Sequence, residues 1–140
     1  MFGEFVSGAL GAMIGAGVSF LTLKYNYRDL YARNISANRM DWINNFREEI
    51  GLIVAALNCD GADVAYEAEK ARASLLTRLN LDTSKEGNEF NGVMADVLNG
   101  IDFEKKYVNS KNIADTLIEL SRKILEPEWQ RVKKETGGDK

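Results

Sequence analysis

Residues 5–23 read FVSGALGAMIGAGVSFLTL, an uncharged run of 19 residues in a chain of 140 residues of which 28% are charged. At about 1.5 Å of rise per residue, a helix of this length reaches about 28 Å, close to the roughly 30 Å of a bilayer's hydrocarbon layer. Glu4 and Lys24 bound the run, where charged side chains reach water. The sequence therefore predicts a transmembrane helix here.

Two other interpretations of this stretch compete with a membrane span. A cleaved signal peptide carries Lys or Arg ahead of its apolar core, whereas the only charged side chain ahead of this run is Glu4. The second is a buried helix of a soluble protein, but each glycine weakens a helix in water by about 1 kcal/mol relative to alanine. The run holds four glycines, which favours the membrane span: Gly8, Gly11, Gly15 and Gly17.

The charges around the run predict its orientation. Residues 24–40 carry a charge of +3, from Lys24, Arg28, Arg33 and Arg39 against Asp29. The N-terminal flank holds only the α-amino group and Glu4, so the positive-inside rule places residues 24–140 in the cytoplasm and the N-terminus outside an inner (plasma) membrane. Three tyrosines follow the span, as is typical of an interfacial aromatic belt: Tyr25, Tyr27 and Tyr31. The basic residues beside them suit anionic lipid headgroups.

Small residues recur at every fourth position of the predicted span. Ser7, Gly11, Gly15 and Ser19 fall on one helical stripe that includes a GxxxG step. Helices associate in lipid through close backbone packing, which such a stripe permits. The sequence therefore predicts a partner for the span, either a second copy of the chain or another membrane protein. Chance spacing in a Gly- and Ala-rich span is the alternative.

The rest of the chain has the apolar spacing of helices, without the alternation typical of strands. Four helices are expected, over about residues 36–57, 60–79, 84–98 and 110–135. The predicted fold is therefore all-α, one N-terminal transmembrane helix followed by a small cytoplasmic helical bundle. Its parts are a transmembrane helix at 1–24, a juxtamembrane helical connector at 25–35, the bundle at 36–135 and a flexible tail at 136–140.

Apolar residues at spacings of three and four predict the bundle's core. The first helix contributes Ile43, Phe46, Ile50, Ile53 and Leu57. The third contributes Phe90, Val93, Met94, Val97 and Leu98, and the last contributes Ile113, Leu117, Leu120, Ile124, Trp129 and Val132. Three capping signals are expected to begin helices, at Asp60, Thr83–Glu86 and Ser110. We expect a kink or a restart at Pro127, and an end at Gly137 and Gly138.

The densest polar stretch, residues 39–50, follows the connector. Its pattern R-x-x-W-I-N-x-F-R-x-E-I resembles a segment found just after the single span of many small uncharacterised bacterial and phage membrane proteins. A Leu-Asn-Pro run and a closing basic-aromatic helix often follow in that group. Leu79-Asn80 and residues 129–134 are similar to them, although Leu81 stands in place of the proline. The resemblance implies one span with a cytoplasmic helical domain, and it brings no known activity.

The same stretch supplies the candidate interaction surface, Arg39, Trp42 and Arg47. Arg47 is expected to pair with an acidic residue of a neighbouring helix at the edge of the bundle. The alternative is that these side chains only pack and form solvated ion pairs. A catalytic pair made of Glu48 and Glu49 is disfavoured, because adjacent residues of a helix do not converge on one point.

The composition argues against catalysis and against most ligands. The chain has no histidine, the usual general base and the commonest zinc ligand. Cys59 is its only cysteine and has no histidine to activate it, and no phosphate-binding or metal-binding motif occurs. The net charge of −3 disfavours nucleic acid. We therefore expect no catalytic residue, cofactor, metal, nucleic acid or small-molecule substrate.

Three functions follow from these features. The first is a membrane-anchored, non-enzymatic interaction or scaffold protein, whose span self-associates or docks a partner. The alternative is an oligomeric membrane-active effector, related to phage lysis or to defence. A small enzyme held at the membrane is the third, and no constellation of residues supports it. The sequence identifies neither the partner nor the biological process.

Overall fold

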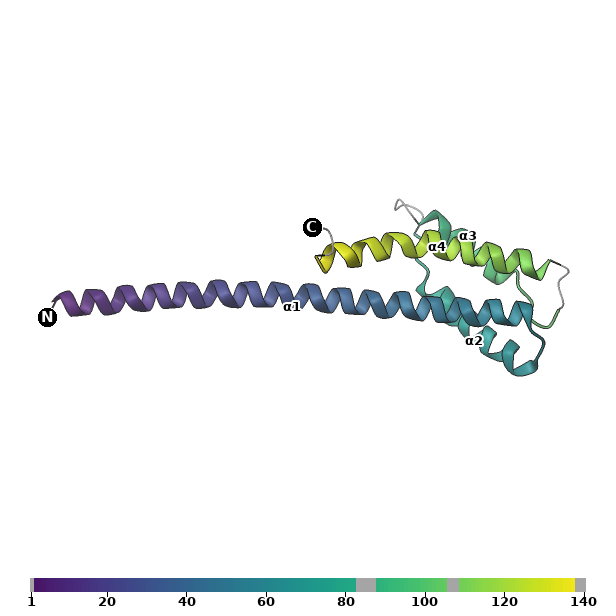
Figure 1. The fold of residues 1–140 in the computed structure, drawn as a ribbon, viewed down its shortest axis with the longest axis horizontal. Coiled ribbons are helices and arrows are strands. Elements are labelled where there is room, and N and C mark those ends of the chain that lie inside the picture. The colour runs from purple at the N-terminus through teal and green to yellow at the C-terminus, as the bar shows by residue number, and fades with distance from the viewer. Residues whose placement is uncertain (1, 83–87, 106–108, 138–140) are drawn as a thin grey trace. The chain divides into compact units, whose positions relative to one another are not determined.

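The computed structural model of the chain is all-helical, with no strand among the residues that it describes (Figure 1). It describes the backbone at residues 2–82, 88–105 and 109–137, and the side chains in the same ranges except for residues 2–15 and 17. Within these ranges the helices are α1 (Phe2–Asn58), α2 (Ala62–Arg78), α3 (Glu89–Asn99) and α4 (Ser110–Glu135). The prediction of an all-α fold is confirmed.

The chain divides into two compact units, residues 1–38 and residues 39–140. The first unit contains only the N-terminal part of α1, and the second contains the rest of α1 with α2, α3 and α4. Among the described residues, no helix combines the length and the apolarity needed to cross a membrane. Most side chains of the predicted span, residues 5–23, lie outside the described part of the chain.

The core of the second unit forms where all four helices contribute apolar side chains. The predicted stripe of α1 is buried at Ile43, Phe46, Ile50 and Ile53, and Leu57 packs against it half-buried. A fully buried side chain of this size contributes about 1.5–3 kcal/mol, so this stripe fixes which side of α1 faces the bundle. The prediction for α3 is wrong at one position, because Val93 is exposed on the solvent side while Met94 and Leu98 are buried.

The helix ends differ from the predicted capping residues. The cap of α2 is Gly61, whose φ of +155° only glycine adopts readily, so the prediction of Asp60 is wrong by one residue. The cap of α4 is Asn109, and Ser110 is the first residue of the helix. Asn109 makes no side-chain hydrogen bond to its helix, and Gly61 has no side chain with which to make one. At the C-terminal end, Gly137 with a φ of +76° follows α4, as expected.

Two further expectations concern α3 and α4. Helix α3 begins at Glu89, later than predicted, and the expected capping box at Thr83–Glu86 lies outside the described residues. Helix α4 continues through Pro127 without a restart. Proline removes one backbone hydrogen bond, and Pro127 is exposed, so water can hydrate the carbonyl group that loses its partner. The restart predicted there is therefore wrong, and the kink stays a prediction.

A buried carboxylate joins α1 to α2. Glu49 is nearly buried, and its two oxygens accept hydrogen bonds from Nε of Arg78 at 3.0 and 3.1 Å. The hydroxyl of Ser74 donates a further bond to Glu49 at 2.5 Å. Burying a carboxylate is tolerated only when it is paired and hydrogen-bonded, and both conditions are met here.

Arg72 of α2 reaches the C-terminal end of α3. Its Nη1 donates to the carbonyl oxygens of Ile101 at 2.5 Å and Leu98 at 3.4 Å. The guanidinium also lies 5.3 Å from the ring centroid of Phe103 and pairs with Glu69 in its own helix. Because the last carbonyl groups of a helix lack partners within it, Arg72 both satisfies them and complements the helix dipole.

Candidate interaction surface

The N-terminal part of α1 carries a run of large apolar and aromatic side chains that face solvent. Eight of them, between 56% and 75% exposed, form what we call the exposed apolar segment: Val18, Phe20, Leu21, Leu23, Tyr25, Tyr27, Leu30 and Tyr31. These side chains lie on several sides of the helix, because each residue is rotated by about 100° from the one before it. Contiguous exposed apolar surface of this kind marks a site of contact with a membrane or a protein.

Basic side chains are interleaved with the exposed apolar segment. Arg33 pairs with Asp29 at 3.3 Å, and both side chains are well exposed. Within the described side chains, Lys24 and Arg28 have no acidic partner. Two uncompensated cations beside exposed tyrosines form a surface suited to anionic groups.

The predicted packing stripe of the span is largely beyond what the structure describes. The side chain of Ser7 and the surroundings of Gly11 and Gly15 lie outside what the structure describes. Ser19 is described and exposed, next to Val18 and Phe20 of the exposed apolar segment. The stripe stays a prediction.

Arg39, the first residue predicted for an interaction surface, binds α4 within the second unit. Its Nε lies 3.1 Å from a carboxylate oxygen of Glu128, and its Nη1 donates to Glu135. All three side chains are only about a quarter exposed, because 23%, 25% and 28% of their surfaces reach solvent. Arg39 therefore holds the C-terminal half of α4 against α1.

Trp42 and Arg47 lie further along the same helix. Trp42 is half-buried, and its ring centroid is 5.2 Å from that of Phe46 in the core. Arg47 is exposed, and its guanidinium carbon lies 6.0 Å from the ring centroid of Trp129. The expected ion pair of Arg47 with a neighbouring helix is thus made by Arg39 instead. The signal that was missed is the spacing of Glu128 and Glu135, which are seven residues apart and therefore lie on one side of α4.

Arg47 and Trp129 also line a shallow groove between α1 and α4. The groove has a volume of about 350 Å³. Arg122 and Glu126 also line it, together with Ile50, Ile118, Ser121 and Leu125. The hydroxyl of Ser121 is satisfied within α4, where it donates to the carbonyl of Leu117 at 2.6 Å. The groove therefore combines an aromatic side chain, that of Trp129, with charged side chains from both helices.

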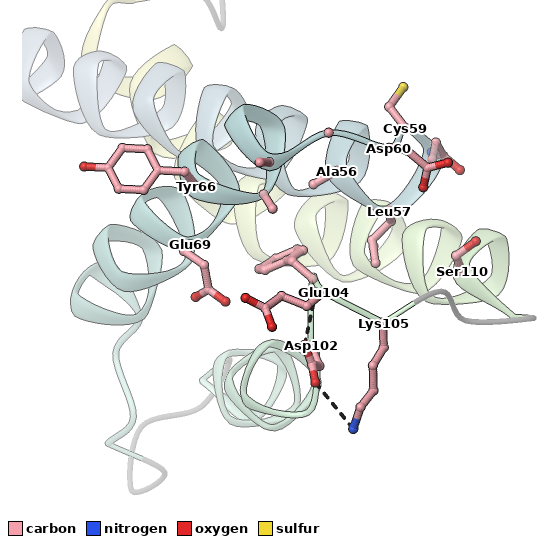
Figure 2. Close-up of a pocket in the computed structure, with 15 residues that line it drawn as sticks. Ala56, Leu57, Cys59, Asp60, Tyr66, Glu69, Asp102, Glu104, Lys105 and Ser110 are labelled. Atoms are coloured by element: carbon pink, nitrogen blue, oxygen red, sulfur yellow. Dashed lines mark hydrogen bonds and ion pairs between the residues drawn. The ribbon is translucent and has the colours of Figure 1, made fainter.

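A larger pocket, of about 740 Å³, lies at the end of the bundle where α1 stops and α2 begins (Figure 2). Four carboxylates line it, those of Asp60, Glu69, Asp102 and Glu104. Figure 2 shows the carboxylates of Glu69 and Glu104 pointing toward one another. Glu69 pairs with Arg72, and Asp102 lies 3.4 Å from Lys105.

The chemistry available in the described part of the chain is limited. No group of three or more His, Cys, Asp and Glu side chains in that part is arranged to hold a metal ion. Cys59 lines the larger pocket and is exposed. The most distinctive surface is therefore the exposed apolar segment of α1. Comparison with protein families, with curated proteins and with solved structures gives no match to the chain.

Proposed function

We propose that the protein is a non-enzymatic interaction protein anchored in a membrane by the apolar N-terminal part of α1, with its helical bundle in the cytoplasm. The observation that carries the proposal is the exposed apolar segment, residues 18–31. Side chains such as Phe20, Leu21 and Leu23 remain in water unless lipid or protein covers them. Burying an apolar side chain of this size is favourable by about 1.5–3 kcal/mol, so the segment has a strong tendency to leave water.

The apolar residues of the run favour insertion only modestly. The uncharged run at residues 5–23 holds eight Leu, Ile, Phe or Val residues. At about −0.3 to −0.6 kcal/mol each, they favour insertion by roughly −2 to −5 kcal/mol, from which the costs of four Gly, two Ser and one Thr are subtracted. The margin for insertion is therefore small, so a single charge within the run is expected to matter.

The segment after the run supports a cytoplasmic position for the bundle. Tyr25, Tyr27 and Tyr31 are exposed and sit where an aromatic belt would meet the headgroups. Lys24 and Arg28 have no acidic partner in the described side chains, so each is available to an anionic lipid at about 1 kcal/mol. The bundle, in turn, presents the Arg47 and Trp129 groove to a cytoplasmic partner.

Membrane flotation of the full-length protein tests the anchoring. Lysed cells are treated with carbonate at high pH, which strips peripheral proteins, and then separated on a density gradient. We expect the protein to float with the lipid, together with a known single-span protein added as a reference. Recovery of most of the chain at the bottom of the gradient would contradict the proposal.

Cysteine labelling tests the orientation. Cys59 is the only cysteine and is exposed, so an impermeant maleimide reports which side of the membrane it lies on. We expect no labelling in intact spheroplasts and full labelling after lysis. The matched control replaces Cys59 by Ser and Glu4 by Cys, and we expect the opposite pattern, labelling before lysis. Labelling of Cys59 in intact spheroplasts would reverse the orientation.

A further inference from the structure

The exposed apolar segment contains a regular seam. Phe20, Leu23, Tyr27 and Leu30 are separated by three, four and three residues, and all four are exposed. Apolar residues that alternate at spacings of three and four repeat every 3.5 residues and lie along one line of a supercoiled helix. They occupy the positions called a and d in a coiled-coil heptad, with Phe20 and Tyr27 at a.

The same repeat continues on both sides of these four residues. Towards the C-terminus the next positions are Asn34 and Ala37, which are also exposed. Towards the N-terminus the sequence places small or apolar residues at the next positions: Ala16, Met13 and Ala9. The repeat from residue 9 to residue 37 thus covers about four heptads, the length at which such a pattern is typical of a coiled coil. Gly11 and Gly15 fall outside this repeat.

We propose that this seam pairs with the same seam of a second copy of the chain, as a parallel two-stranded coiled coil in register. The parallel direction rests on the proposed function, because two copies anchored in one membrane enter it with the same orientation. The pairing itself rests on the seam alone.

Asn34 favours a second copy of the chain, rather than a helix of another protein, as the partner of the seam. It stands at an a position, where a lone asparagine fixes the register and the number of strands of a coiled coil. A carboxamide both donates and accepts hydrogen bonds, so it is satisfied by the carboxamide of its own copy across the seam. A different helix would leave Asn34 facing an apolar residue unless it carried a matching polar group at the same height.

The charges beside the seam agree with this alignment. In a parallel pair, Lys24 lies opposite Ser19 of the other copy, and Arg33 lies opposite Asn38. No like charges therefore face one another across the interface. Among the other four members of the exposed apolar segment, Val18 and Leu21 fall off the seam, where lipid can cover them without competing with the second copy.

Disulfide trapping of the full-length protein tests the pairing. In a Cys59→Ser background, Ala37→Cys places a thiol within the seam and leaves Asn34 in place, and Asp29→Cys places one on an exposed position outside the seam. Membranes are exposed to a mild oxidant and the products are separated without reductant. We expect about tenfold more covalent dimer from Ala37→Cys than from Asp29→Cys. Equal yields, no dimer, or a product containing a different protein would overturn the proposal.

Two tyrosines provide a matched pair of second-site variants. Tyr25 and Tyr27 are equally exposed, at 74% and 75%, but only Tyr27 lies in the seam. Combined with Ala37→Cys, Tyr27→Lys is expected to lower the dimer yield at least about fivefold, and Tyr25→Lys to change it less than about twofold. The same loss from both variants would contradict the seam. Far-ultraviolet circular dichroism checks that the helical content is unchanged.

The same samples separate this proposal from the proposed function. Each is fractionated before oxidation, so dimer yield and membrane binding are measured independently. A covalent dimer in the soluble fraction means that the pairing holds and the anchoring fails. A monomer that floats with lipid means that the anchoring holds and the pairing is wrong.

Discussion

A single charge in the N-terminal part of α1 gives the sharpest test of the membrane anchor. Val18 lies five residues before the end of the uncharged run, about 7.5 Å inside it at 1.5 Å per residue. Arginine costs about 2.5–3.5 kcal/mol at the centre of a span and less near its edge, where it snorkels. For Val18→Arg we take about 2 kcal/mol, which lowers the ratio of inserted to soluble protein about 30-fold.

Val93→Arg is the matched control for this variant. Val18 and Val93 are both exposed residues of a helix, at 59% and 48%. Val18 lies in the uncharged run, whereas Val93 lies on α3 in the bundle. A substitution on the exposed side of the bundle changes stability by no more than about 0.5 kcal/mol. Both variants are followed by gradient flotation with quantitative immunoblotting. We expect Val18→Arg to shift strongly towards the soluble or degraded fraction and Val93→Arg to float like the wild type.

Two results would refute this reasoning. If Val18→Arg floats as completely as the wild type, the insertion free energy is not the small quantity estimated above, or the run is not inserted. If Val93→Arg leaves the membrane to the same extent, the bundle and not the N-terminal run binds lipid. Because Val18 lies outside the coiled-coil seam, a change in pairing does not produce either outcome.

Three further predictions concern the stability of the bundle and the effect of the protein on the membrane potential. Phe46→Ala, in the core, is expected to lower the free energy of unfolding by about 3–5 kcal/mol. Its control, the exposed Leu52→Ala, is expected to lower it by less than about 1 kcal/mol. Both are measured by urea unfolding, followed by tryptophan fluorescence in mild detergent. Glu49→Ala leaves Arg78 without its buried partner and is expected to cost about 2 kcal/mol in the same assay, against about 0.5 kcal/mol or less for the exposed Glu48→Ala; equal effects would show that the ion pair contributes nothing. Strong induction is expected to leave the signal of a membrane-potential dye unchanged, and rapid depolarisation would instead favour the membrane-active effector.

The core of the bundle was predictable because burial leaves a periodic signal in the sequence. Ile43, Phe46, Ile50 and Ile53 follow the spacing of one helical side, and the structure buries all four. Helix ends leave a weaker signal, since several polar residues near a boundary are compatible with a cap. The choice between Asp60 and Gly61 depends on a backbone conformation that the residue types alone do not specify. Helix α4 continues through Pro127 without the restart, because the cost of a proline depends on exposure to solvent, which spacing alone does not give.

The interaction surface was predictable only in part. The tyrosines and basic residues after the uncharged run were identified from their order in the chain, and the structure leaves the tyrosines exposed. The roles of Arg39 and Arg47 were not, because helical spacing shows which side a residue occupies but not which residue of another helix lies opposite. That information arises only when α4 packs against α1 and brings Glu128 beside Arg39.

The contact of Arg72 with the end of α3 has a consequence for how the bundle comes apart. Helix α3 has 11 residues and no basic residue in its last turn, and a helix of that length is marginal by itself in water. Arg72 of α2 donates to the carbonyl of Leu98 in the last turn of α3 and to that of Ile101 just after it, in addition to the backbone bonds made there. The amide protons of these two helices should therefore lose their protection against hydrogen exchange together, as one cooperative unit, when either helix detaches.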